Sequence, residues 1–197
     1  MFARYATPIK KGLVTALLMS GSSDRLSPRQ CMGSRSKRQF VPPEFVVPDE
    51  LSTPNFRLRM LSIDDVEKDF DAVTSSAAHL SKVWPDTGWP HGLTIKQNLI
   101  DLAWHEKEFQ NRSSFAYTAV THDESRVLGC VYFYPTDKAG FDVEVFVWVR
   151  ESELANDLDT KLCEAVRSWL ATDWPFDHPA YPGREIDWDR WEALPTD

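Results

Sequence analysis

The sequence predicts one α/β domain, of α+β type in its order of elements, with a mixed, mostly antiparallel, twisted sheet flanked by helices. Three strand-like runs at 114–121, 127–134 and 141–149 are separated by short turns and indicate an antiparallel meander. A strand and two helices precede them, and a regular amphipathic helix follows. The 197 residues, 42% of them hydrophobic, suffice for one domain with a full core, so a second domain is not expected.

The elements before the meander follow from local patterns. Residues 56–61 alternate apolar and basic side chains like a half-buried strand, and Ser62 with the acids after it begins a helix that runs to about Ser75. Residues 81–92 hold two Trp-Pro pairs and two glycines, which predict a loop. A second helix is expected over 94–110.

The last strand of the meander and the elements after it are predicted in the same way. In 141–149 the valines share one face, which we expect to be core, and acids and aromatic residues share the other. Apolar residues at spacings of three and four predict a helix over 154–172. A short strand around 178–181 and a helical turn around 188–194 complete the pattern.

Charge divides the chain into parts. Residues 1–40 carry a net charge of +7, and residues 41–197 carry −15. We expect 1–40 to be a basic, disordered extension, 41–55 a proline-rich extended linker, and 56–197 the domain. Residues 1–40 have other interpretations. The apolar run 12–19 after two lysines also suits a signal peptide, and the Arg- and Ser-rich composition suits an organellar transit peptide. The segment is also explained if the start codon is placed too far upstream.

Several classes of protein are disfavoured. The apolar run is far shorter than the ~20 residues of a membrane span, so no membrane partner is expected. A domain of charge −15 repels phosphates, which makes nucleic acid an unlikely partner. His105 lacks the second histidine of a zinc motif, and we expect no metal. Cys130 and Cys163 are interpreted as reduced core residues, which favours a cytoplasmic protein, with an organelle as the alternative.

From Phe56 to about Tyr181 the order strand, helix, helix, three-strand meander, helix resembles the GNAT acetyltransferase superfamily. The resemblance implies a GNAT-like sheet and acetyl-CoA as co-substrate. Members of the superfamily carry a Q/R-x-x-G-x-G/A turn between the fourth strand and the next helix, where backbone N–H groups and the helix N-terminus hold the pyrophosphate. Glycine is needed there because a Cβ would block the approach.

The turn is degenerate in this chain. Aligned from Val149, Leu154 falls on the Q/R position, and Ala155, Asp157 and Asp159 fall on the glycine-rich positions. A carboxylate ~4 Å from a phosphate repels it by ~4 kcal/mol at an effective dielectric near ~20, more than the ~1 kcal/mol attraction of a helix end. The cofactor-binding residues implied by the resemblance are Trp148, Val149, Ala155, Asn156, Asp157, Leu158 and Asp159.

A structural interpretation of the same acids stays open. Asn156 then caps the helix, while Asp157 and Asp159 lie in its first turn and complement its dipole.

The resemblance also implies two catalytic residues. Glu144 lies on the non-core face of the fourth strand, where it is the candidate general base, acting directly or through a water. Tyr181 is the candidate general acid. An ion-paired strand acid and a tyrosine that braces a proline-rich turn are the structural alternatives. Few residues follow Tyr181, so the substrate side of the GNAT domain is expected to be truncated at the C-terminus.

Two functions follow. The first is acetyl-CoA-dependent transfer of an acetyl group to an unknown amine by direct attack. The alternative is a non-catalytic GNAT-fold module that binds a small ligand or a protein partner without CoA. Tryptophans at 84, 89, 104 and 148 predict an aromatic pocket for an apolar or cationic ligand, with core packing as the other interpretation.

Overall fold

The computed structural model of the chain describes residues 39–85 and 87–196, so the predictions made for residues 1–38 lie outside the described part. The elements of this part, in chain order, are β1 (Glu50–Ser52), β2 (Arg57–Met60), η1 (Ile63–Asp65), α2 (Val66–Ser75), α3 (Ala77–Val83), α4 (Ile95–Gln110), β3 (Phe115–Val120), β4 (Val127–Tyr134), β5 (Val143–Val149), η2 (Glu151–Asn156), α5 (Leu158–Asp173), β6 (Pro179–Ala180) and α6 (Trp188–Ala193).

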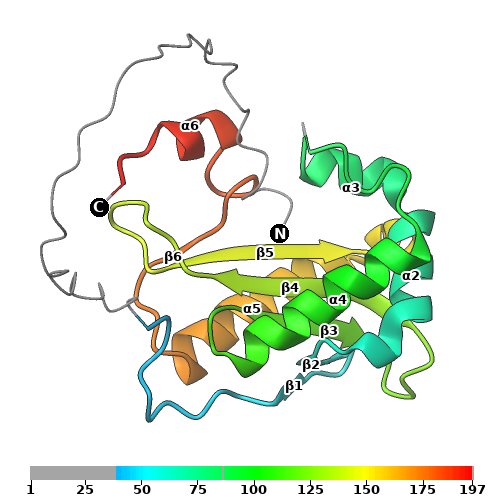
Figure 1. Cartoon of the computed structure of the whole chain (residues 1–197), viewed down its shortest axis with the longest axis horizontal. Helices are drawn as coiled ribbons and strands as arrows, with labels where there is room; N and C mark the ends of the chain where they lie inside the picture. The colour runs from blue at the N-terminus through cyan, green and yellow to red at the C-terminus, as the bar shows by residue number, and fades with distance from the viewer. Residues whose placement is uncertain (1–38, 86, 197) are drawn as a thin grey trace, which may run out of the picture. The chain divides into compact units, whose positions relative to one another are not determined.

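The sheet has six strands in the order β1-β2-β3-β4-β5-β6, drawn in Figure 1. Strands β1 to β5 pair antiparallel, and only β5 and β6 pair parallel. The meander β3-β4-β5 is the one that the sequence predicts. Connections of a few residues allow only antiparallel neighbours, whereas the parallel β6 needs the crossover helix α5.

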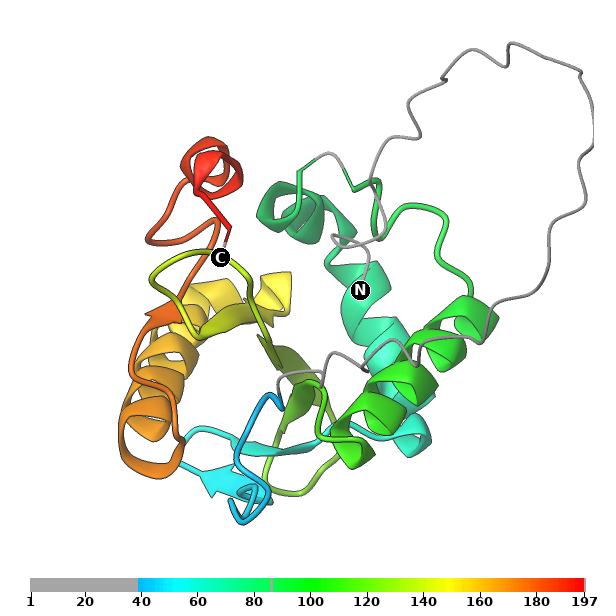
Figure 2. The same cartoon turned by 60° about the vertical axis from the view of Figure 1, so that its left-hand side comes forward.

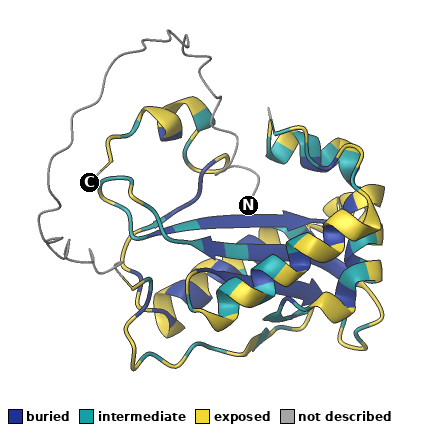
Figure 3. Ribbon diagram, viewed as in Figure 1, coloured by how far each residue is buried: buried dark blue, intermediate teal, exposed yellow. Residues whose placement is uncertain are grey.

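Helices cover both faces of this sheet. In Figure 2, α5 lies on one side of the strands and α2 and α4 on the other. Figure 3 shows the strands as the buried layer between them. Both faces of β5 are therefore covered, which corrects the expectation that only its valine face is core: Trp148 is fully buried on the α2 and α4 side. Cys130 and Cys163 are free and buried, as predicted.

The expected linker 41–55 packs on the domain. It contains β1, and its Pro48 carbonyl accepts a hydrogen bond from the hydroxyl of Tyr117 at 2.7 Å. Val41 is buried in the core on the α5 side. Apolar side chains of this segment thus find partners on the sheet, and the compact part of the chain begins before Phe56.

Local signals explain where two of the helices begin. The Ser62 hydroxyl accepts from the amide of Asp64 at the start of η1. Thr94 and Gln97 form a capping box at the start of α4, in which each side chain bonds the backbone of the other. The short helix α3 was not predicted, because it lies across the start of a segment that reads as a loop.

No helix of residues 39–85 and 87–196 is both long enough and apolar enough to cross a membrane.

Candidate functional site

The end of β5 is anchored by a buried arginine. Arg150, directly after the strand, donates from Nε to the Val127 carbonyl at 2.5 Å and from Nη1 to the Ser75 hydroxyl at 3.3 Å. Its Nη2 pairs with Asp71 at 2.7 Å. These contacts tie β5 to β4 and α2, so the turn that follows starts from a fixed point.

The turn predicted to hold pyrophosphate forms the short helix η2 and then breaks at Asp157. This residue has φ of 57° and ψ of 26°, the left-handed conformation that glycine adopts most readily. An aspartate tolerates it better than most residues, so the turn has a glycine-like backbone shape at one of the three positions that the resemblance aligns with the glycine-rich turn.

The interpretation of Asn156 as the helix cap is corrected by the structure. The cap position of α5 is Asp157, whose side chain makes no capping hydrogen bond, and the side-chain Nδ2 of Asn156 donates to the carboxylate of Glu153 at 3.0 Å. Leu154 lies in η2 and not in the long helix. Among the turn residues, Leu158 is buried in the core, whereas Ala155 is exposed.

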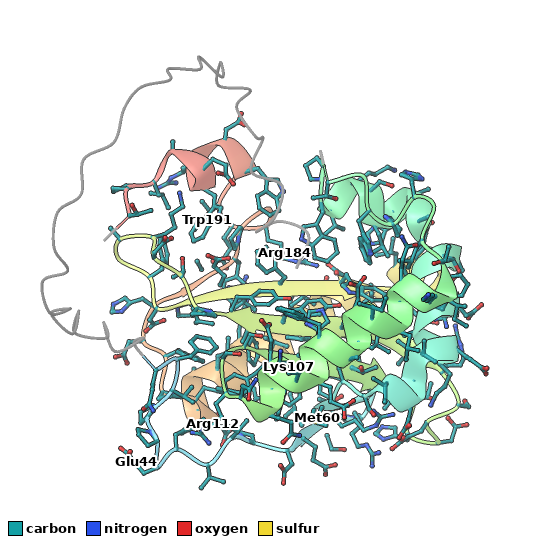
Figure 4. All side chains as sticks on the ribbon, viewed as in Figure 1. Glu44, Met60, Lys107, Arg112, Arg184 and Trp191 are labelled. Atoms are coloured by element: carbon teal, nitrogen blue, oxygen red, sulfur yellow. The ribbon has the colours of Figure 1, made fainter. Side chains whose placement is uncertain are left out.

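Asp159 in the first turn of α5 is paired with an arginine that the sequence did not indicate. Arg184 Nη1 donates to Asp159 Oδ2 at 2.8 Å, and Nη2 donates to Oδ1 at 2.6 Å. The same Nη2 donates to the carbonyl of Val147 at 2.9 Å. Figure 4 shows Arg184 beside β5, on the segment that leads to α6. Its hydrogen bonds with Asp159 raise the pKa of Arg184 above its usual value.

The carbonyl that Arg184 contacts lies on an open edge of β5. Strand β6 pairs with β5 only at Val143 and Glu144, and the chain then leaves in a turn. The Arg150 amide donates to the Leu128 carbonyl of β4, so even-numbered residues bond to β4 and odd-numbered residues direct their backbone groups away from it. Beyond Glu144 the backbone of Val147 therefore faces the place where a further strand would lie.

Tyr181 directly follows β6, at the point where β5 and β6 cease to pair. It is buried, its ring lies 4.3 Å from the guanidinium carbon of Arg167, and its hydroxyl has no hydrogen-bond partner among the described residues. Burial raises the pKa of Tyr181 to about 12, so the hydroxyl keeps its proton at neutral pH. A buried hydroxyl without a partner is costly for the folded protein and calls for an explanation.

Glu144 lies near the start of β5, half-buried, opposite Tyr134 of β4. Asp142, directly before β5, accepts hydrogen bonds from the backbone amides of Asp177 and His178 at 2.7 and 3.1 Å and so fixes the segment that leads to β6. Glu144 is five residues from Val149, about 16 Å along an extended strand, so it is not next to the η2 turn.

The predicted cofactor residues Trp148 and Val149 can offer only backbone atoms to a ligand, because both side chains are fully buried. The Trp148 indole donates from Nε1 to the Tyr132 hydroxyl at 3.2 Å. Trp148 belongs to the core on the α2 and α4 side, and Val149 belongs to the core on the α5 side.

Sequence reasoning missed a buried acid that lies against β4. Asp69 of α2 accepts a hydrogen bond from Asn98 at 2.9 Å and one from the thiol of Cys130, with a sulfur–oxygen distance of 3.7 Å. Burial raises the pKa of Asp69 to about 6. A signal was present: residues 69, 72, 73 and 76 share the helical spacing of one buried stripe.

Metal ligands do not gather anywhere in residues 39–85 and 87–196, where no group of three His, Cys, Asp or Glu side chains could hold an ion. His105, the histidine weighed in the sequence, is buried in α4 with its ring 5.0 Å from that of Tyr132. Burial lowers the pKa of His105 to about 3, so it is neutral at physiological pH.

Comparisons by sequence find no relatives: no family model matches the chain, and no curated protein matches it. Solved structures do match. The ribosomal-protein-S5-alanine acetyltransferase from Vibrio fischeri aligns with a TM-score of 0.52 at 13% identity, over 61% of this chain and 66% of that chain. The microcin C7 self-immunity acetyltransferase MccE, in complex with acetyl-CoA and AMP, aligns with 0.52 at 11%, over 65% and 71%.

A third structure, RimL, a ribosomal L7/L12 α-N-protein acetyltransferase in complex with coenzyme A, has a TM-score of 0.51 at 16% identity, over 62% of this chain and 68% of that chain. Identities this low show the fold alone. The chain has the fold of the GNAT acetyltransferases, as its order of elements predicted, and its sequence diverges far from these neighbours.

The η2 turn can be tested for its fit to the pyrophosphate of acetyl-CoA. Four acids lie between residues 151 and 159, but Arg184 neutralises Asp159, and Arg126 pairs with Glu153 at 3.1 Å. Lys161 adds a cation that donates to the carbonyl of Asn156 at 2.9 Å. The repulsion expected from the carboxylates is thus largely offset by cations that the local sequence pattern does not reveal, and the residues present fit the group.

Proposed function

We propose that this protein is a GNAT-type acyltransferase that binds acetyl-CoA and acetylates an amine. The observation that supports it best is the separation of β5 and β6 after Glu144, which leaves an open strand edge beside the start of α5 and the unpartnered hydroxyl of Tyr181. A closed sheet at this position would leave no backbone groups for a ligand.

The residues that would hold acetyl-CoA are the backbone of β5 around Val147 and Val149, the turn 155–159, and Arg184. The cofactor supplies the activated acetyl group as a thioester. Arg184 presents a planar fork of donors that suits a phosphate as well as it suits a carboxylate. Its hydrogen bonds with Asp159 and the Val147 carbonyl use three of its five N–H donors, so a phosphate can share the guanidinium while Asp159 stays paired.

Two side chains are assigned to proton transfer. Glu144 accepts the proton of the acceptor ammonium, because it is a half-buried carboxylate of β5 and shares a strand face with Phe146. Tyr181 holds its proton up to a pH of about 12, which is the state that a general acid requires. Asp142 is not assigned a part, because its oxygens are engaged by backbone amides.

Calorimetric titration of the full chain with acetyl-CoA tests the proposal. We expect a dissociation constant tighter than ~100 μM, equivalent to about −5.5 kcal/mol. Arg184→Ala should weaken binding about tenfold, whereas Arg190→Ala, which removes the same charge from the exposed surface of α6, should leave it unchanged. Glu144→Gln should lower the rate of acetyl transfer and leave acetyl-CoA affinity intact.

A second function is favoured by one observation. Arg184 already donates hydrogen bonds to the Val147 carbonyl and to Asp159, so the chain itself fills part of the strand edge where acetyl-CoA would lie. A GNAT-fold module that binds a small ligand or a protein without CoA is consistent with this closed arrangement. Absence of binding at ~1 mM acetyl-CoA in wild type and in Asp159→Gly would refute the acyltransferase proposal and support the module.

A further inference from the structure

Aromatic rings from two distant parts of the chain converge on one residue of β5. Phe146 has the indole of Trp188 at 6.1 Å between ring centroids and an interplanar angle of 12°, and that of Trp84 at 6.3 Å. Trp89 packs edge-on against Trp84 at 5.2 Å. We name these four residues, Trp84, Trp89, Phe146 and Trp188, the indole cluster.

The indole cluster differs from the core tryptophans in its exposure. Trp148 is fully buried, whereas the three tryptophans of the cluster are half-buried. Trp84 and Trp89 come from the segment after α3, and Trp188 begins α6; Figures 1 and 2 both show α3 and α6 standing apart on the same side of β5. The rings therefore approach β5 from two separate supports and keep part of their surface open to solvent.

The backbone is shaped to seat Trp188. Gly183 has φ of 75°, and a Cβ added there would lie 2.7 Å from Nε1 of the Trp188 indole. The turn around it is closed by the Gly183 amide, which donates to the Ile186 carbonyl at 2.8 Å. Trp188 thus lies between a bare glycine and the ring of Phe146, a placement that any other residue at 183 would disturb.

The chemistry around the indole cluster suits a cation. Aromatic faces attract ammonium groups, and tryptophan does so most strongly. Glu144 shares the face of Phe146 and lies two residues away, about 7 Å along the strand. The exposed acids Asp187 and Asp189 flank Trp188, and residues 41–197 carry a net charge of −15. Arg184, which reaches the carbonyl of the neighbouring Val147, is paired with Asp159, so an anionic acceptor would meet an excess of carboxylates here.

We propose that the indole cluster and Glu144 form the acceptor site, and that its ligand is an organic ammonium ion carried on a flat, apolar body. The ring faces hold the apolar body, and the carboxylate of Glu144 lies beside the ammonium, where it accepts the proton that the amine must lose before it can act as a nucleophile. This inference deepens the proposed acyltransferase function by naming the class of its acceptor.

Binding of benzylammonium to the full chain, measured by calorimetry without acetyl-CoA, tests the proposal. Benzyl alcohol serves as the neutral isostere and benzoate as the anionic one. We expect benzylammonium to bind at least fivefold more tightly than benzyl alcohol, and benzoate to bind more weakly than either. Glu144→Gln should remove the preference for the cation and leave the affinity for benzyl alcohol unchanged.

Variants of the rings locate the site. Trp188→Leu should weaken benzylammonium binding about tenfold, and Trp188→Phe, which keeps a ring, should restore most of it even if the leucine variant folds poorly. Trp104→Leu, a half-buried tryptophan of α4 outside the cluster, is the matched control and should bind like wild type. Equal affinity for benzylammonium and benzoate, or full affinity in Trp188→Phe and Trp188→Leu alike, would overturn the proposal.

The outcome is separable from that of the acyltransferase proposal, because the titration contains no acetyl-CoA. If the chain binds benzylammonium as expected but does not bind acetyl-CoA, the ammonium site is supported and the acyltransferase proposal is refuted. If the chain binds acetyl-CoA but shows no preference for benzylammonium, the acyltransferase proposal is supported and this assignment of its acceptor is refuted.

Discussion

Replacement of Asp69 by asparagine should change how stability depends on pH. The carboxyl is buried, and burial raises its pKa from 3.8 to about 6. Between these values the folded state binds more protons than the unfolded state, so the free energy of unfolding falls as pH rises from about 4 to about 6. A shift of about two pKa units corresponds to about 3 kcal/mol. Asparagine has no charge to bury, and Asp69→Asn should remove this loss.

A second buried group acts in the opposite direction over the same range. Burial lowers the pKa of His105 from 6.5 to about 3, so here the unfolded state binds more protons in the window between the two values. His105 therefore makes the protein more stable as pH rises toward about 6.5. In wild type the two effects oppose each other between about pH 4 and pH 6, and the variant should reveal the rise caused by His105.

Urea unfolding at about pH 4, 5, 6 and 7 measures the effect. The gain in free energy of unfolding from about pH 4 to about pH 7 should be larger in Asp69→Asn than in wild type by about 3 kcal/mol. Any pH-independent cost of the new amide cancels, because only differences between pH values are compared. Asp64→Asn, an exposed acid of η1, should follow wild type. Identical pH dependence in Asp69→Asn and wild type would refute the assignment of a raised pKa.

Three glycine substitutions, one of them a control, test the geometry of β5 and its covering turn. Gly183→Ala should lower the free energy of unfolding by about 2–3 kcal/mol and alter tryptophan fluorescence, since it adds a clash with Trp188 to the cost of a positive φ. Gly92 has a similar φ of 72°, but an added Cβ would meet nothing within 4 Å, so Gly92→Ala should lose only about 1 kcal/mol. Equal losses in the two variants would show that Trp188 is not seated as described. Gly129→Ala should lower the free energy of unfolding by about 3 kcal/mol or more, because the added Cβ collides with the Trp148 backbone. An unchanged midpoint of urea unfolding would contradict this close contact between β4 and β5.

Periodicity predicted the elements that are long and regular. The meander strands and the helix 158–173 follow directly from residue spacing, because each buries a continuous stripe or face. The boundary at Asp157 had no such signal: the apolar spacing runs through it from Leu154, and only the left-handed backbone of an aspartate ends η2 there. The spacing of the helix was therefore extended one turn too far toward its N-terminus.

The site was predicted less completely than the fold, and the reason is distance along the chain. Asp159 carries a local pattern that reads as a helix start, but its partner Arg184 lies 25 residues later, and no period connects them. The charge argument against a phosphate counted only neighbours in sequence and so omitted this cation. The buried position of Asp69 was different, because its helical stripe with Ala72 and Val73 was readable in the sequence.

A single turn connects the two halves of the candidate site. The carbonyl of Tyr181 accepts from three successive amides, the first of them that of Arg184, and the chain then reaches Trp188. Arg184 holds the edge of β5 at Val147, and the indole of Trp188 stacks on the ring of the neighbouring residue Phe146. A ligand that displaces Arg184 from the edge must loosen the turn that seats Trp188. Affinities at the β5 edge and at the indole cluster should therefore be coupled, and by thermodynamic linkage the coupling must be the same whichever ligand binds first.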